Sequence, residues 1–139
     1  MIVLDTNVVS EPLKQAPNPA VVDWLNAQAP ETLYLTAVNL AELLAGIELL
    51  PTGKRKTALK KALDVQILPL FEGRILAFDV KAATTFAKIN AKAQAAGSPL
   101  GFADGAIAAI ALANKFAVAT RNVGDFANTG VKIINPWDI

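Results

Sequence analysis

Carboxylates are the side chains of this sequence whose types and positions best suit catalysis. The chain contains no histidine and no cysteine, so it lacks the side chains that most often act as a neutral-pH base or an activated nucleophile. Asp5 directly follows the apolar run Ile2–Leu4, while Glu42 and Asp104 each lie in an apolar, helix-like segment. A charged side chain in apolar surroundings is costly unless it is paired. Each of these three acids therefore requires a cation, a hydrogen-bond donor or a proton.

A divalent cation would satisfy these acids together. A fourth acid, Asp125, follows a later apolar run over residues 116–120. Two like charges about 4 Å apart repel by roughly 4 kcal/mol at an effective dielectric constant of 20, so carboxylates do not gather for stability alone. Carboxylate oxygens suit Mg²⁺ and Mn²⁺, and such sites hydrolyse phosphodiesters. The pattern predicts a Mg²⁺ (or Mn²⁺) site formed by Asp5, Glu42 and Asp104, with Asp125 as a further catalytic acid.

Each acid also has an ordinary interpretation when it is taken alone. Asp5 would cap a short turn made with Thr6 and Asn7, Glu42 would pair with a lysine, and Asp104 would interact with the dipole at its helix N-terminus. The metal site is the preferred interpretation because all of the acids are expected at one edge of a sheet.

The expected elements explain why the acids should meet. Apolar runs predict strands, and helical spacing with capping residues predicts helices. The strands are expected at residues 2–4, 33–35, 75–78, 116–120 and 131–134, and the helices at 18–25, 37–50, 54–66, 79–96 and 102–114. This alternation predicts an α/β fold with a mainly parallel sheet of four or five strands covered on both faces. Ligands of such sheets bind beyond the carboxyl ends of the strands.

The composition limits the remaining possibilities. A chain of 139 residues fits one domain, and a net charge of +1 gives no global field that attracts nucleic acid. The absence of cysteine fits a reducing compartment. No segment has the length of a membrane span or the pattern of a signal peptide, so a cytoplasmic location is expected. The hydrophobic fraction of 53% suggests apolar surface for a partner or a second copy.

Four motifs in the same order resemble the PIN-domain ribonucleases, and the resemblance covers nearly the whole chain. The motifs are Ile2-Val3-Leu4-Asp5-Thr6-Asn7, Ala41-Glu42-Leu43, residues 103–108 (ADGAIA) and residues 120–126 (TRNVGDF). The closing Asn135-Pro136-Trp137 is similar to the tail of the VapC and FitB-type toxins of bacterial toxin–antitoxin pairs. The resemblance implies that residues 1–139 form one PIN domain, a three-layer α/β/α fold. It also implies divalent-metal-dependent cleavage of RNA by metal-activated water.

The resemblance also implies roles for single residues. In this family the metal ligands fall on Asp5, Glu42 and Asp104. The fourth acid varies in placement, so either Asn122 or Asp125 would supply the fourth ligand. The remaining polar residues would contact substrate or support the ligands: Thr6 and Thr120 by orienting water or a phosphate, Asn7 by holding Asp5, and Arg121 by stabilising charge on phosphate oxygens.

Partners follow from the same resemblance. VapC-type toxins form homodimers, or higher oligomers with a small antitoxin, and operator DNA is bound only through that antitoxin. The hairpin over residues 37–66 is the expected antitoxin site, since a helix in an apolar groove is a recurring binding mode. Lys54, Arg55 and Lys56 would contact the RNA backbone, although a solvated helix face explains them equally simply.

Two other classes of function compete with the nuclease. A PIN-like module could bind nucleic acid or antitoxin with little catalysis. A phosphatase could use Asp5 as its nucleophile, but such enzymes have a second acid two residues later, where this chain has Asn7. A phosphoreceiver domain needs paired acids around its first strand, and these are absent. Cleavage of RNA that EDTA abolishes would separate the nuclease from both alternatives.

Overall fold

The computed structural model describes residues 1–139 and contains one sheet of five strands in the order β3-β2-β1-β4-β5. All neighbouring strands are parallel, which confirms the predicted sheet. The strands are β1 (Ile2–Leu4), β2 (Leu33–Thr36), β3 (Ile75–Leu76), β4 (Ala117–Ala119) and β5 (Ile133–Ile134). The strand order reverses between β1 and β4, and a ligand site of an open parallel sheet is expected outside the carboxyl ends at such a point.

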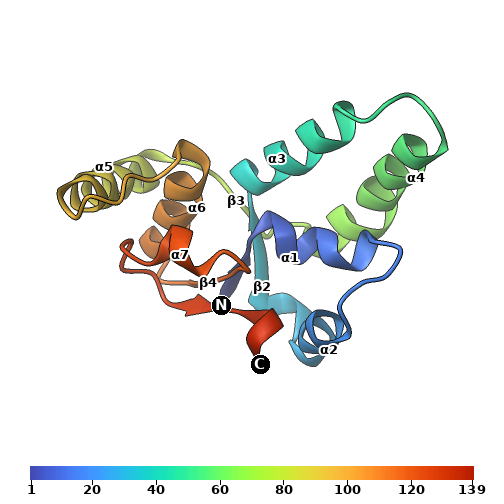
Figure 1. The fold of residues 1–139 in the computed structure, drawn as a ribbon, viewed down its shortest axis with the longest axis horizontal. Coiled ribbons are helices and arrows are strands. Elements are labelled where there is room, and N and C mark those ends of the chain that lie inside the picture. Colours follow the sequence, from blue (N-terminus) through green and yellow to red (C-terminus); the bar gives the residue numbers. More distant parts are fainter.

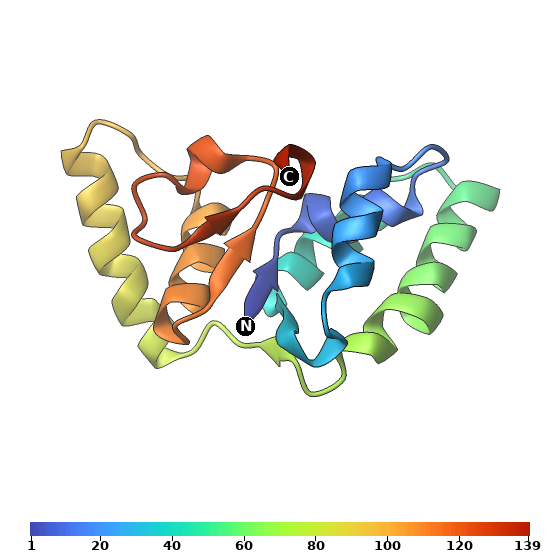
Figure 2. The same ribbon diagram turned by 90° about the horizontal axis from the view of Figure 1, so that it is seen from below.

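Seven helices and five short helical turns connect the strands (Figures 1 and 2). The helices are α1 (Thr6–Ser10), α2 (Pro19–Ala27), α3 (Ala37–Glu48), α4 (Lys54–Ala62), α5 (Val80–Ala95), α6 (Phe102–Ala113) and α7 (Val123–Phe126). The short turns are η1 (Glu11–Leu13), η2 (Pro30–Thr32), η3 (Leu63–Ile67), η4 (Leu68–Phe71) and η5 (Pro136–Asp138). No helix is both long enough and apolar enough to cross a membrane.

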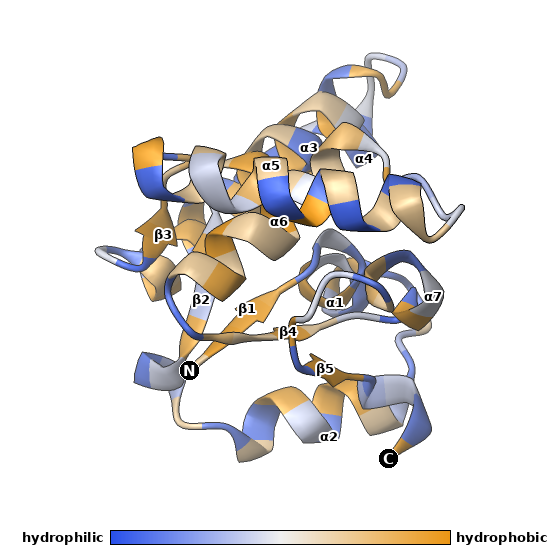
Figure 3. Ribbon diagram, turned by 90° about the vertical axis from the view of Figure 1, so that its left-hand side faces the viewer, coloured by the Kyte–Doolittle hydropathy of each residue, from blue (hydrophilic) through white to orange (hydrophobic).

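The sheet lies between two helical layers, as expected for an α/β/α fold. Figure 3 shows the apolar strands between α2 on one side and α5 and α6 on the other. Because successive strand residues point to opposite faces, Leu4 packs into one hydrophobic cluster and Val3 into the other. The first cluster includes residues of α1, α2 and α3, and the second includes residues of α6 and α7. The short strands are thus buried on both faces.

Local rules explain most helix boundaries, and two differences from the prediction are informative. Thr36 caps α3 and Asp79 caps α5, as predicted. The helix expected over residues 54–66 ends at Ala62 and widens into the π-turn η3. Pro69 lies two residues after the end of η3. It has no N–H with which to continue an α-helix. The strand expected over residues 75–78 contains only Ile75 and Leu76.

Two short helices were not predicted from the sequence. The alternative interpretation of Asp5 was a cap on a short turn; the Asp5 side chain does accept the Thr6 N–H as a cap, but Thr6 begins helix α1 instead of a turn. Helix α7 has only four residues, too few for a periodic pattern. Helix α1 follows β1 almost directly and α7 follows β4 after a short loop, so both shape the edge where the acids were expected.

Candidate active site

Asp5 and Thr120 stand side by side where β1 and β4 end. The strand register aligns Leu4 with Ala119, and the Asp5 N–H donates to the Ala119 carbonyl at 2.9 Å. Asp5 and Thr120, which follow Leu4 and Ala119, therefore lie beside each other just beyond the sheet. Asp5 is only 5% exposed and Thr120 is fully buried. The strand-order reversal thus places one carboxylate and one hydroxyl in a sheltered position.

Four side-chain or backbone donors surround the Asp5 carboxylate. Its Oδ1 accepts from the Thr6 N–H at 2.8 Å and lies 3.4 Å from Asn39 Nδ2. Its Oδ2 accepts from Thr120 Oγ1 at 2.8 Å and lies 3.5 Å from Asn7 Nδ2. Burial raises the pKa of Asp5 above its ordinary value of 3.8, although the hydrogen bonds from Thr120 and Thr6 oppose this rise. The donors hold the side chain in one orientation.

Glu42 extends from α3 toward the same region. The Thr6 hydroxyl donates to Glu42 Oε1 at 2.7 Å, which joins the start of α1 to α3. The apolar neighbours of Glu42 in the sequence suggested burial, but the side chain is exposed. The buried stripe of α3 contains Asn39, Leu43 and Ile47, so Glu42 lies off that stripe. Its exposure leaves its other carboxylate oxygen accessible to a ligand.

Asp104 lies in the first turn of α6 and is partly exposed. Burial first, and then the negative charges of Asp5, Asp125 and Glu42, raise the pKa of Asp104 from its ordinary value of 3.8 to about 6. The two ion pairs of the protein join Lys14 to Glu11 and Lys60 to Asp64. No lysine or arginine therefore neutralises the four acids of the site. Their charges act on one another without compensation.

Asp125, on α7, is the fourth acid of this group. Its charge raises the pKa of both Asp5 and Asp104. The neighbouring candidate, Asn122, directs its backbone N–H to Thr120 Oγ1 at 3.0 Å and precedes α7 as its cap residue. Asp125 thus acts on two of the acids electrostatically, whereas Asn122 contacts the residue that supports Asp5.

The four acids, Asp5, Glu42, Asp104 and Asp125, fit a divalent cation by their chemistry. All offer hard carboxylate oxygens, which Mg²⁺ and Mn²⁺ prefer, and their charge is uncompensated. In the structure as it stands, however, no three acidic side chains are arranged to hold one metal ion. Like charges repel, so closer approach of these side chains would require a cation among them.

The family of the chain follows from comparison with known proteins. A model of the PIN domain matches residues 2–132. The chain belongs to the PIN-domain family. It is 48% identical over 138 residues to "VapC ribonuclease Y4jK" of Sinorhizobium fredii, and 47% identical over 137 residues to "Toxin FitB" of Neisseria gonorrhoeae. Each match covers 99% of both chains.

A solved structure agrees with this assignment. The structure of FitAB bound to an IR36 DNA fragment contains a chain with 45% identity and a TM-score of 0.96, and the match covers 100% of this chain and 97% of that one. The resemblance to VapC and FitB-type proteins that the motifs suggested is therefore confirmed, as is the PIN-like fold.

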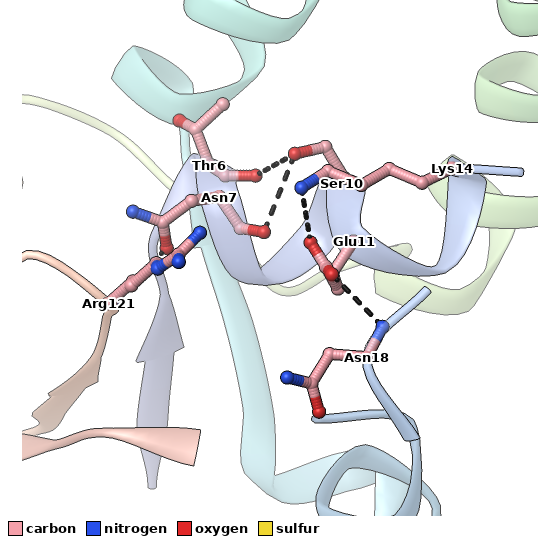
Figure 4. A network of polar contacts seen from close by, with 7 residues as sticks. All are labelled: Thr6, Asn7, Ser10, Glu11, Lys14, Asn18 and Arg121. Atoms are coloured by element: carbon pink, nitrogen blue, oxygen red, sulfur yellow. Dashed lines mark hydrogen bonds and ion pairs between the residues drawn. The ribbon is translucent and has the colours of Figure 1, made fainter. Parts of the chain in front are cut away.

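Arg121 of this PIN domain is held on the side of the site nearest the C-terminal tail. Its backbone N–H donates to Asn7 Oδ1 at 3.3 Å, and its guanidinium carbon lies 5.4 Å from the centre of the Trp137 ring. Figure 4 shows Arg121 beside Asn7, next to α1. Asn7 therefore links the Asp5 carboxylate to the loop that follows β4. Trp24 and Trp137 pack against the first hydrophobic cluster.

Two polar residues near the site were missed by the sequence analysis. Glu11 has a side chain that is 5% exposed; its Oε2 lies 2.8 Å from Lys14 Nζ, and its Oε1 accepts the Asn18 N–H at 3.1 Å (Figure 4). The ion pair is the only polar contact of Oε2, and contact with Lys14 holds the pKa of Glu11 below its ordinary value. The Glu-x-x-Lys spacing indicated this pair.

Asn39 is the second missed residue. It is fully buried and forms a capping box with Thr36, because each side chain bonds the backbone N–H of the other residue. The three-residue spacing after a helix-capping threonine is the sequence pattern of such a box, so this contact was predictable. The contacts of Asn39 with Asp5 and Thr6 were not, since they join segments 33 and 34 residues apart.

The basic residues Lys54, Arg55 and Lys56 form the first turn of α4. Lys56 is partly buried and donates to the Glu48 carbonyl at 3.0 Å, so it helps to close α3. Lys54 and Arg55 are exposed. Positive charges in the first turn of a helix oppose its dipole by typically 0.3–1 kcal/mol each. Lys54 and Arg55 therefore do not stabilise α4.

Proposed function

We propose that this PIN domain is a divalent-metal-dependent endoribonuclease and the toxin of a toxin–antitoxin pair in the cytoplasm. The observation that carries the proposal is that Asp5, Asp125 and Glu42 lie near enough to Asp104 for their charges to add to burial in raising its pKa to about 6, while no lysine or arginine pairs with any of the four acids. RNA is proposed as the substrate because a relative that spans the whole chain is named a VapC ribonuclease.

The chemistry divides between the cation and the side chains. A bound Mg²⁺ or Mn²⁺ supplies an activated water and neutralises charge that develops on the phosphate. Asp5 and Asp104 would hold the cation, with Glu42 and Asp125 completing its surroundings. Thr120 fixes Asp5 through its 2.8 Å hydrogen bond, and Thr6 fixes Glu42 at 2.7 Å. These hydroxyls keep the acids oriented before substrate binds.

The same contacts weigh against the phosphatase. Both Asp5 oxygens accept a hydrogen bond of 2.8 Å, which stabilises the carboxylate and lowers its reactivity as a nucleophile. The residue two positions later, Asn7, places its amide near Asp5 and cannot serve as an acid.

Cleavage of a labelled single-stranded RNA in Mg²⁺, in Mn²⁺ and in EDTA tests the proposal. We expect cleavage in both metals and none in EDTA, with activity restored when metal is added back. Cleavage that survives EDTA would contradict the nuclease mechanism. RNA binding without cleavage in either metal would instead support the catalytically weak binding module.

The fourth acid can be identified with two matched variants. Asp125→Asn should lower the rate of RNA cleavage about 10- to 100-fold, the usual range for a residue that supports a metal site, because its charge acts on Asp5 and Asp104. Asn122→Ala should change the rate much less. Single-turnover rates at fixed Mg²⁺ measure both. The reverse order of effects would assign the fourth ligand to Asn122.

Lys54 and Arg55 are proposed to bind the RNA backbone. They are exposed and oppose the dipole of α4, so their position has a cost in stability that phosphate contacts would offset. Lys56 is left out of this role because it already closes α3.

An antitoxin is proposed to occupy an apolar hollow next to η3, at the C-terminal end of the hairpin expected over residues 37–66. The hollow has a volume of about 460 Å³ and is lined by α2, η1, η3 and η4, including Leu13, Leu25, Ile67 and Leu70. It reaches the hairpin at Gln66, the end of the segment where the antitoxin was expected. Leu70 is 61% exposed at this hollow. The solved FitAB complex contains a second protein beside a chain very similar to this one.

A charge in the hollow should separate toxicity from neutralisation. Leu70→Asp should remain toxic when expressed alone but should escape the antitoxin that neutralises the wild-type chain, because a buried unpaired carboxylate disfavours docking. Growth of cells that coexpress both proteins measures this. Leu49→Asp is the matched control, since Leu49 is 86% exposed at the end of α3, outside the hollow. Escape of the control alone would move the binding site to the tip of the hairpin.

A further inference from the structure

We propose that Asn39 positions the metal site, by setting both the orientation of the Asp5 carboxylate and the direction of the Thr6 hydroxyl proton toward Glu42. The inference rests on the proposed function, because it names a residue that prepares the same site for a cation. Asn39 is fully buried on α3 and three residues before Glu42. It touches neither the substrate nor the cation in this role.

The orientation of the Asn39 amide is fixed by Thr36. Its Oδ1 accepts from the Thr36 backbone N–H at 3.1 Å and from the Thr36 hydroxyl at 2.7 Å. A backbone N–H only donates, so the amide cannot be flipped without placing two donors against each other. Nδ2 must therefore point the other way. It lies 3.4 Å from Asp5 Oδ1 and 3.3 Å from Thr6 Oγ1.

This orientation determines the proton of the Thr6 hydroxyl. A hydroxyl has one proton and can also accept hydrogen bonds. Because Nδ2 of Asn39 offers only protons, Thr6 Oγ1 accepts on that side and donates its own proton to Glu42 Oε1 at 2.7 Å. Glu42 is thereby held in place as a hydrogen-bond acceptor. One buried amide thus acts on two of the acids, directly on Asp5 and through Thr6 on Glu42.

The two Nδ2 contacts are long for hydrogen bonds, so they add little to the stability of the fold. The contacts with Thr36 are the ones that cap α3. Loss of the cap and loss of the contacts to the acids are therefore separable effects. Partners of metal ligands typically change metal affinity or activity 10- to 100-fold when they are removed.

Mn²⁺ titration of the RNA-free protein, followed by calorimetry or by the EPR signal of free Mn²⁺, tests the inference. Asn39→Ala should weaken Mn²⁺ binding about tenfold or more, and RNA cleavage should recover when Mn²⁺ is raised. Asn39→Ser also removes the Nδ2 donor without adding a charge and keeps a hydroxyl that can accept from Thr36, so it should weaken binding as well, with a smaller loss of thermal stability than Asn39→Ala. Asn18→Ala is the matched control, because Asn18 caps α2 and its loss should leave Mn²⁺ affinity unchanged.

A double variant tests the route through Thr6. Thr6→Val should weaken Mn²⁺ binding, and Thr6→Val with Asn39→Ala should weaken it by less than the product of the two single effects, because both act on Glu42. Mn²⁺ affinity of Asn39→Ala within twofold of the wild type would overturn the inference and leave the proposed function intact. A wild-type protein that binds no Mn²⁺ would overturn both.

Discussion

Replacement of Asp5 with Asn is expected to lower RNA cleavage about a thousandfold, while the protein remains folded. The size of the effect follows from the loss of a group that would hold charge at the reacting phosphate, where a single lost interaction costs roughly 10²–10³ in rate. Asp5 is the most buried of the four acids and has donors on both oxygens. An asparagine keeps the shape of the side chain but carries no charge to bind a cation. Single-turnover cleavage at saturating protein measures the loss.

Asp79→Asn is the matched control for this experiment. It removes the same charge from an acid that caps α5 by accepting the Ala82 N–H, and asparagine is an equally good capping residue. Its cleavage rate should equal that of the wild type. Equal loss in both variants would show that the effect of Asp5→Asn comes from net charge or stability rather than from the site.

Replacement of Asp104 with Asn should have opposite effects on activity and on stability. Cleavage should fall by a factor comparable to that for Asp5→Asn, because a ligand is lost. The metal-free protein should become more stable, since the variant removes the buried charge and its repulsion by the other acids, which together raise the pKa of Asp104 to about 6. After a discount for its partial exposure, the gain is roughly 1 kcal/mol, or a melting temperature higher by about 4 °C. Thermal unfolding in EDTA measures it.

The raised pKa of Asp104 determines how the stability of the metal-free protein changes with pH. The folded Asp104 carboxyl, with a pKa of about 6 rather than 3.8, binds its proton more tightly than the unfolded chain does. The metal-free wild type should therefore lose stability as the pH rises from about 4 to about 6, and the full penalty is present above that range. The Asp104→Asn variant should gain stability at pH 7.5 but not at pH 4. A gain of equal size at both pH values would show that the charge of Asp104 is not its cause.

The sequence predicted the parallel sheet and the position of Asp5 at its carboxyl edge because both follow from the placement of residues along strands. Asp5 directly follows an apolar strand, and the parallel register places it beside Thr120. The exposure of Glu42 could not be predicted from its apolar neighbours, because a helix surrounded by several elements carries apolar residues on more than one face. The contacts of Asn39 depend on how β1, α1 and α3 meet, and local patterns contain no information on such long-range pairs.

The short elements α1 and η3 could not be predicted from the sequence pattern either. Helix α1 begins at the Asp5 cap of the Thr6 N–H, and the π-turn η3 contains the fully buried Leu63 and is followed by Pro69. Neither is long enough to show a period of 3.6 residues. Sequence patterns therefore located the carboxyl edge of the sheet, while the detailed arrangement of donors around the acids required the tertiary structure.

Diffraction from crystals soaked in Mn²⁺, recorded at a wavelength where manganese scatters anomalously, tests the central claim most directly. The account predicts at least one strong anomalous peak among Asp5, Glu42, Asp104 and Asp125, about 2.0–2.3 Å from oxygens of Asp5 and Asp104, with the four side chains closer together than in the metal-free protein. Absence of any peak there at millimolar Mn²⁺, with the acids still apart, would contradict it.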